Sequence, residues 1–201
     1  MRTAIDCFAQ YGYAGTSIDR IAKAAGVTKG ALYYHFRDKA QLRSEAVAER
    51  IEAFEELVLE ATGPMLDPRD ALRKVYAICA QIARTDNQRR FILTMMVEAI
   101  DTDDALSAQF LQMLKRFRAF HGQLIRRGQE EGIFRTDVDP RTASETMVGS
   151  ILGAEVQFYQ DPQGFDLDRA LDAQIDQLFA WLAPRETMGG DQDQGGSRNH
   201  V

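Results

Sequence analysis

The sequence has 201 residues, of which 45% are hydrophobic and 27% charged, a composition typical of a soluble globular protein. It contains no apolar run near the roughly 18 residues that a membrane-spanning helix needs. The first segment is not typical of a signal peptide, because Asp6 and Gln10 interrupt its apolar positions. We therefore expect a cytoplasmic protein without a membrane partner.

The net charge of −6 hides an asymmetry along the chain. Residues 1–50 carry eight Lys or Arg against five Asp or Glu, which puts this segment at +3 and the remainder at −9. A small basic module on a larger acidic domain is typical of a phosphate-binding unit attached to a body with another task.

The cysteines and histidines show no spacing that indicates a metal or redox site. Cys7 and Cys79 each lie in an apolar helical pattern, so we expect both in the core. His35, His121 and His200 are far apart in the sequence. With no nucleophile–base constellation or phosphate loop either, we expect no metal, no cofactor and no enzyme activity.

Helical periodicity begins with the first residues. Ile5, Phe8 and Ala9 repeat at helical spacing, and Gly12 is expected to end this helix. The amphipathic pattern is already under way at Met1, so the helix is expected either to start upstream or to lack its first turn.

Two short helices joined by a glycine turn are predicted next. Thr16 and Ser17 offer N-cap oxygens to the first of them, and residues 18–25 present one apolar face. Gly26 can end this helix in the left-handed conformation, and Thr28 is placed to cap the second. This pattern is the sequence form of a helix-turn-helix.

The helix after the turn carries polar groups that a core would not require. Leu32 and Phe36 form its inner pair, which leaves Lys29 and Tyr33 on an outward face. Lysine, phenol and imidazole groups bind phosphates and base edges. Each ring taken alone is equally compatible with packing between helices, but the whole set favours contact with the DNA major groove.

The stretch YGYAGTSIDRIAKAAGVTKGALYYHFRDKAQL, from Tyr11 to Leu42, resembles the DNA-binding signature of TetR-family transcriptional regulators. The matching motifs are Gly-x-x-x-Thr-Ser, Ile-Ala-x-x-Ala-Gly-Val, Gly-x-Leu-Tyr-x-His-Phe and Lys-x-x-Leu. The resemblance implies an all-helical homodimer of about nine helices that binds a double-stranded DNA operator. It also implies DNA contacts at Thr16, Ser17, Thr28, Lys29, Gly30, Ala31, Tyr33, Tyr34, His35 and Lys39. The family usually has about two more helical turns before AIDCFAQYG, so Arg2 is the candidate phosphate contact of the first helix.

Longer helices are predicted for the rest of the chain. One begins near Asp38 and ends near Glu60, where TGPMLDP breaks it. Five more are expected at roughly 69–84, 87–100, 104–131, 140–160 and 166–183. We expect a helix-turn-helix domain at 1–50, a helical ligand-binding and dimerisation domain at 51–185, and a disordered tail at 186–201.

The last two helices are predicted to form a dimer interface. Small residues four apart let helices approach closely, and an apolar stripe follows the final helix. Two such helices from each subunit would make a four-helix interface, and the alternative is that both stripes are buried within one chain. The predicted interface residues are Val148, Gly149, Ile151, Leu152, Gly153, Leu171, Ile175, Leu178 and Leu182.

A pocket for an unidentified small-molecule effector is the second expected feature of the body. Soft Met and Phe side chains suit an adaptable apolar pocket, although an ordinary core explains each residue at least as well. Glu98 and Glu155 fall in apolar surroundings and are candidates to face a cationic ligand, although a solvated or interface position explains each of them better. The segment from Gly149 to Leu171 resembles the end of a regulator subfamily that includes betaine-pathway repressors. The predicted pocket residues are Met95, Met96, Phe110, Met113, Phe117, His121 and Phe158.

The sequence thus predicts a homodimeric repressor that binds a near-palindromic operator and is released by a small molecule. One alternative is a helical DNA-binding protein without an inducer, which acts through protein contacts or nucleoid association. Activation in place of repression is also compatible with the sequence. A ligand-sized cavity in the body would favour the inducible regulator.

Overall fold

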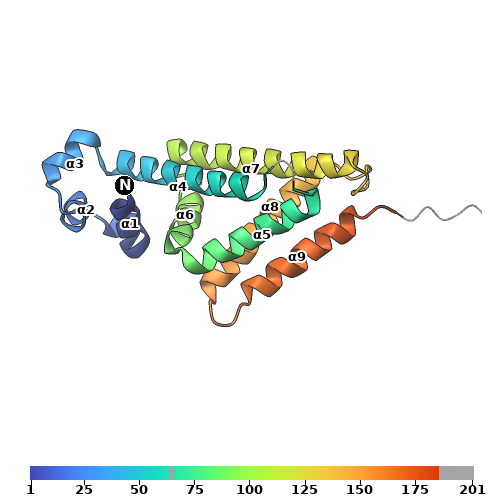
Figure 1. The fold of residues 1–201 in the computed structure, drawn as a ribbon. Helices are drawn as coiled ribbons and strands as arrows, with labels where there is room; N and C mark the ends of the chain where they lie inside the picture. Colours follow the sequence, from blue (N-terminus) through green and yellow to red (C-terminus); the bar gives the residue numbers. More distant parts are fainter. Residues whose placement is uncertain (64–65, 186–201) are drawn as a thin grey trace, which may run out of the picture.

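The computed structural model describes residues 1–63 and 66–185, and within them the chain forms nine α-helices and no strand (Figure 1). The helices are α1 (Arg2–Gly15), α2 (Ile18–Ala25), α3 (Lys29–His35), α4 (Lys39–Ala61), α5 (Pro68–Thr85), α6 (Asn87–Glu98), α7 (Asp104–Glu130), α8 (Pro140–Gln160) and α9 (Leu167–Leu182). The all-α class and the expected number of helices are confirmed. The tail predicted at 186–201 lies outside the described residues.

The glycines of the first three helices bend the chain where the sequence indicated. Gly26 takes a φ of 69° and ends α2 in the left-handed conformation, as predicted. Gly12 also has a positive φ, 71°, but it kinks α1, which continues to Gly15. Ser17 and Thr28 cap α2 and α3, each accepting a backbone N–H at 3.1 Å.

Aspartates start all the later helices. Each carboxylate accepts a backbone N–H from the first turn, where a negative charge also complements the helix dipole. The N-caps of α4 to α9 are Asp38, Asp67, Asp86, Asp103, Asp139 and Asp166. Pro68 and Pro140 occupy the first helical positions of α5 and α8 and lose no helical hydrogen bond there.

We call α1–α3 the head and α5–α9 the body; α4 connects them. In Figure 1 the head lies at one end of α4, and α7 runs beside α4 while α5, α8 and α9 form the other side of the body. None of the helices within the described residues combines the length and apolar character required to cross a bilayer.

Two hydrophobic cores divide the molecule, and their boundary does not follow the sequence. One core joins α1, α2 and the first half of α4 to α6 and the first half of α7, through residues such as Phe8, Leu42, Phe91, Met95 and Phe110. The other joins the far end of α4 to α5, α8, α9 and the second half of α7. The proposed domain boundary near residue 50 therefore crosses a continuous head core.

Polar contacts fasten the head and α4 to the body. Arg43 and Arg50 of α4 form ion pairs with the helix-capping Asp103 and Asp86. Gln88 Nε2 donates a hydrogen bond to Asp6 of α1 at 2.6 Å. A movement of α6 or α7 would consequently be transmitted to the head.

Candidate DNA interface and effector pocket

The outward face of α3 is open to solvent. Tyr34 is 86% exposed and Tyr33 is 49% exposed, and the Tyr34 ring meets the ring of its neighbour His35 edge-on at 5.1 Å. These tyrosines therefore do not pack between helices in the single chain, and the alternative that they serve only as packing residues is excluded for this subunit. The exposed residues of this face are Thr28, Lys29, Gly30, Ala31, Tyr33, Tyr34 and His35.

Lys29 is held on this face by an ion pair with α2. Its Nζ lies 2.9 Å from Asp19 Oδ2, and both side chains are more than half exposed. The hydrogen bond and the charge of Asp19 raise the pKa of Lys29, so the ammonium is charged near neutral pH. An exposed pair of this kind is weak and screened by salt, so a phosphate can compete for the lysine.

Thr16 does not face outward, and its predicted contact with the DNA backbone is corrected. Its side chain is buried, and its hydroxyl lies 3.0 Å from the Cys7 carbonyl and 2.7 Å from the Gly12 carbonyl. The hydroxyl has one hydrogen to donate and directs it inward, toward these two carbonyls beside the kink in α1. Ser17 is exposed, but its hydroxyl accepts the capping N–H of Arg20.

Lys39 has a structural task that the sequence did not reveal. Its Nζ donates to the carbonyls of Tyr13 and Thr16 at 2.9 and 3.0 Å, and it lies 4.2 Å from the centre of the Tyr13 ring. An ammonium group has three N–H donors, so at most one remains for a phosphate. The main role of Lys39 in the structure is therefore to join the start of α4 to the end of α1 through these hydrogen bonds.

The apolar stripe of α9 is part of the subunit core and is not an exposed interface. Its members pack within the chain, mainly against α5 and α8. The alternative interpretation, burial within one chain, is correct for Val148, Ile151, Leu171, Ile175, Leu178 and Leu182. A side chain already buried in its own subunit cannot form the surface of a dimer.

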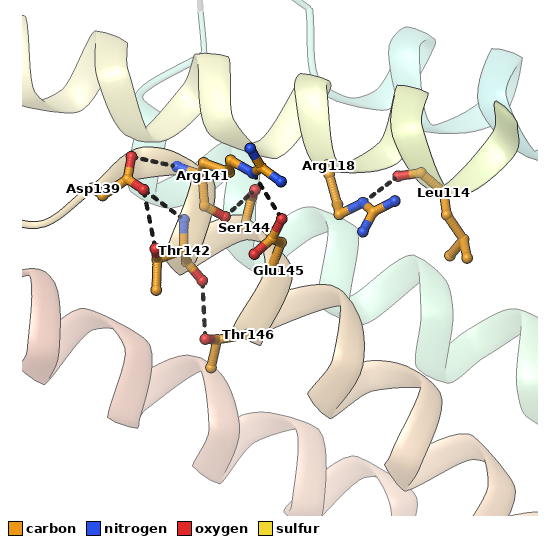
Figure 2. Close-up of polar contacts among 8 residues, drawn as sticks. All are labelled: Leu114, Arg118, Asp139, Arg141, Thr142, Ser144, Glu145 and Thr146. Atoms are coloured by element: carbon orange, nitrogen blue, oxygen red, sulfur yellow. Dashed lines mark hydrogen bonds and ion pairs between the residues drawn. The ribbon is translucent and has the colours of Figure 1, made fainter. Parts of the chain in front are cut away.

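A different face of the same two helices is exposed. Gly149 and Gly153 of α8 lie on it, and a methyl group added to either would meet no atom within 4 Å. Figure 2 shows Thr142 and Thr146 pointing away from α7, two turns and one turn before Gly149, respectively. The exposed residues of this face are Thr142, Thr146, Gly149, Gly153 and Val156 on α8, and Ala173, Gln177, Ala180 and Trp181 on α9.

The predicted pocket residues separate into two groups. Met95 and Phe110 are buried in the head core, and Met96 packs against that core. Phe158 packs against the body core, where it contacts the ring of Tyr159. These four residues are core residues, which corrects their assignment to a pocket, whereas Met113, Phe117 and His121 line a cavity.

This inner cavity lies between α5, the start of α6, α7 and α8, and its volume is about 30 Å³. Its walls are Cys79, Arg89, Met113, Leu114, Phe117, His121, Val148, Ile151 and Leu152. Burial, followed by the charge of Glu155, raises the pKa of the Cys79 thiol to about 12, so this cysteine remains an unreactive thiol.

A buried ion pair closes one end of the inner cavity. Arg89 of α6 donates to both carboxylate oxygens of Glu155 of α8, over 2.9–3.1 Å. Burial raises the pKa of Glu155, and the arginine opposes this shift. Glu155 is therefore neither solvated nor free to face a cationic ligand, which corrects both interpretations, and its partner 66 positions away carried no local signal in the sequence. Glu98 is exposed and therefore solvated.

His121 is fully buried on the wall of the same cavity. Neither of its ring nitrogens has a hydrogen-bond partner of normal geometry among the described residues. Burial lowers the pKa of His121 to about 4, and the Phe117 carbonyl one turn earlier offsets part of this shift. The imidazole is therefore neutral near pH 7, with one N–H donor and one nitrogen acceptor.

A second, outer cavity of about 170 Å³ opens between α4 and α7. Val58, Leu59 and Phe120 provide apolar walls, and Arg116 and Glu55 form an ion pair across its rim, with the Arg116 Nε–Glu55 Oε1 distance at 2.8 Å. Phe117 lines this cavity as well as the inner one.

The groove between α7 and α8 is larger, about 440 Å³, but it is polar and open. Figure 2 shows Arg118 turned back to the Leu114 carbonyl and Arg141 paired with Glu145, at 3.1 and 2.9 Å. Charged side chains that already have hydrogen-bond partners favour a solvated groove over a pocket for an apolar effector.

Comparison with known families gives a consistent result along the chain. Residues 1–46 match the family model described as bacterial regulatory proteins of the tetR family. Residues 68–182 match the model described as the C-terminal part of BetI-type transcriptional repressors. The second match agrees with the resemblance seen from Gly149 to Leu171.

Individual relatives agree with the family models. The transcriptional regulator AcrR of Shigella flexneri is 30% identical over 171 residues, which cover 83% of this chain and 79% of AcrR. A Saccharomonospora viridis protein in complex with choline has a TM-score of 0.83 at 19% identity, covering 92% of this chain and 95% of the other. A complex of SmeT, the Stenotrophomonas maltophilia efflux-pump repressor, with triclosan has a TM-score of 0.74 at 22% identity, covering 90% and 88%. The chain therefore belongs to the TetR family of bacterial transcriptional regulators.

Proposed function

We propose that this protein is a homodimeric repressor that binds a near-palindromic operator and leaves it when a small molecule binds the body. The observation that carries the proposal is the outward face of α3. This seven-residue helix exposes Lys29, two tyrosines and a histidine, and none of these side chains is buried in the core. Lysine contacts with phosphate and tyrosine contacts with base edges would give this face both affinity and sequence preference.

The dimer is assigned to the exposed face of α8 and α9. Gly149, Gly153 and Ala180 leave room for close helix approach, and Trp181 and Val156 add apolar surface. A two-fold axis through this face would place the two α3 helices on the same side of DNA. Half-sites about one helical turn apart, near 34 Å, are then expected.

The small-molecule effector is supported by the cavities between α4, α7 and α8. Among proteins of this fold, SmeT binds triclosan and the S. viridis protein binds choline. An effector can shift the balance between a DNA-binding and a released geometry only by its difference in affinity for the two. Because α4 joins the cavities to the head, we expect the position of α4 to differ between the DNA-binding and the released geometry.

Mapping of the operator tests the proposal. Purified protein would be incubated with fragmented DNA from its own genome at moderate salt, and the retained fragments sequenced. The expected result is one short near-palindrome, with half-sites about one turn apart. Diffuse recovery that disappears as salt rises would indicate phosphate attraction alone, and the nucleoid-type alternative would replace the repressor.

A further inference from the structure

The wall of the inner cavity contains one unusual polar residue, His121. His121 is 0% exposed, and neither ring nitrogen makes a hydrogen bond of normal geometry within the described residues, although the Phe117 carbonyl lies close enough to act on the imidazole. Buried polar groups in folded proteins are nearly always paired, so an unpaired one on a cavity wall requires an explanation. An apolar side chain would fill the same space without burying two polar nitrogens.

The charges around the inner cavity limit which ligands His121 can bind. Its imidazole is neutral near pH 7, and the adjacent charges of Arg89 and Glu155 bind each other through three hydrogen bonds. A cationic ligand would find no free carboxylate, and an anionic ligand would find no free positive charge. A neutral hydroxyl group fits, because it can donate one hydrogen bond and accept another.

The two volumes limit the shape of the ligand. The inner cavity, about 30 Å³, exceeds the roughly 10–15 Å³ of accessible space that one water molecule needs, so it admits a hydroxyl but no ring. The outer cavity, about 170 Å³, exceeds the volume of about 150 Å³ in which a buried apolar cavity is known to hold benzene. One aromatic ring fits the outer cavity, against Val58 and Phe120.

Phe117 is the wall between the two spaces. Its ring stacks on Phe54 of α4, with centroids 5.0 Å apart, and lies 5.8 Å from the His121 ring. A rotation of this single side chain would connect the inner cavity to the outer one.

We propose that the connected cavities bind a neutral hydroxylated aromatic of one ring, with the ring in the outer cavity and the hydroxyl hydrogen-bonded to His121. Phe117 turns aside to admit it. This inference rests on the proposed release of the repressor by a small molecule, and it names the chemical class of that molecule.

A ligand bound in this position would contact α4 directly. When Phe117 turns, its stack on Phe54 is lost, and the ligand ring takes its place against α4. Seven residues before Phe54, α4 also carries Val47 of the head core. The ligand would thus reposition the helix that carries the head.

Fluorine NMR measures this binding without DNA. The probes are 4-fluorophenol and 4-fluorotoluene, which differ in one hydroxyl, with 4-fluorobenzoate as an anion and benzyltrimethylammonium as a competing cation. In the full-length protein, 4-fluorophenol is expected to bind, while the benzoate does not bind and the cation does not compete. Preferential binding of either charged probe would overturn the proposal.

The His121→Leu variant tests the hydrogen bond. The preference for 4-fluorophenol over 4-fluorotoluene should fall by about fivefold or more, because one net hydrogen bond is lost. Met113→Leu changes the same wall without changing a hydrogen-bonding group and should keep the wild-type preference. An unchanged preference in His121→Leu would overturn the assignment.

The Phe117→Ala variant tests the movable wall. It should bind 4-fluorophenol more tightly than the wild type, whereas Phe120→Ala, which alters only the outer cavity, should bind it more weakly. Phe117→Leu replaces Phe117→Ala if the latter does not melt cooperatively. Weaker binding by the Phe117 variant would contradict the role of this ring as a wall.

The outcome is separable from the proposed function. Absence of phenol binding in a protein that still selects a near-palindrome would remove this inference and leave the repressor intact. Binding of phenol that depends on His121, in a protein that selects no DNA site, would support the pocket and remove the operator.

Discussion

Lys29 of α3 and Lys39 at the start of α4 are ten residues apart, and the structure gives them different roles. Lys29 pairs with Asp19 on an exposed face, whereas Lys39 donates to two backbone carbonyls in a half-buried position. The sequence motif places both near DNA, because a motif records which residues recur and not where an ammonium group points. Thr16 illustrates the same limit, since its hydroxyl is directed inward.

Replacement of the two lysines by alanine should separate stability from DNA binding. Lys39→Ala is expected to lower the free energy of unfolding by about 1–3 kcal/mol, because two carbonyls lose a charged donor. Lys29→Ala should leave the melting temperature unchanged and weaken operator binding. Urea denaturation and operator titration of both variants measure this contrast. A Lys39→Ala protein of unaltered stability would contradict the fastening role.

His121 should make the stability of the protein depend on pH. An unfolded chain protonates this histidine below its ordinary pKa of 6.5, but the folded protein does so only near pH 4. The stabilisation is therefore complete above pH 6.5 and declines as pH falls toward 4, by about 3 kcal/mol in total. The difference in unfolding free energy between wild type and His121→Leu isolates this effect. Parallel pH profiles for the two proteins would contradict the burial of a neutral imidazole.

At the scale of the helix, sequence patterns predict the ends well and the partners poorly. Gly26 and Pro140 mark boundaries because backbone geometry alone limits what can occupy those positions. The stripe of α9 correctly indicated one buried face, but periodicity does not distinguish burial against α5 from burial against a second subunit. The same ambiguity affected Met95 and Phe110, since core and pocket walls use the same side chains.

Substitutions on the two faces of α8 and α9 should have opposite effects. Gly153→Arg is expected to leave the subunit folded, because its side chain meets nothing within the chain, and to split the dimer. Leu178→Glu buries a charge in the subunit core and should unfold it. Light scattering and thermal melting report the two outcomes. A Gly153→Arg protein that stays dimeric would place the interface elsewhere.

The whole molecule is held together by contacts that no local pattern encodes. The head core needs Phe91 and Phe110 from the body, and the pair of Arg89 with Glu155 connects helices distant in sequence. Charge asymmetry suggested a separate unit at 1–50, but charge describes the surface and not the core beneath it. Residues 1–50 carry a net charge of +3, but their buried side chains share one core with α6 and α7 of the body.

The isolated segment 1–50 is consequently expected not to fold. Without α6 and α7 it leaves Phe8, Ile21 and Leu42 partly uncovered, and a unit of this size buries too little surface to be stable alone. Circular dichroism should find little cooperative melting in this segment, against one clear transition in the full chain. A cooperatively folded fragment would contradict this expectation and support the predicted boundary near residue 50.

The central claim is that the outward face of α3 reads DNA, and Tyr34 tests it most directly. Tyr34 is 86% exposed, so Tyr34→Ala should keep the wild-type melting temperature. A titration of the mapped operator at fixed salt should show affinity reduced about tenfold, since one base contact contributes about 1–3 kcal/mol. Leu111→Ala, an exposed change on α7, is the control and should bind as the wild type does. Unchanged affinity of Tyr34→Ala for the operator would contradict the assignment of this face.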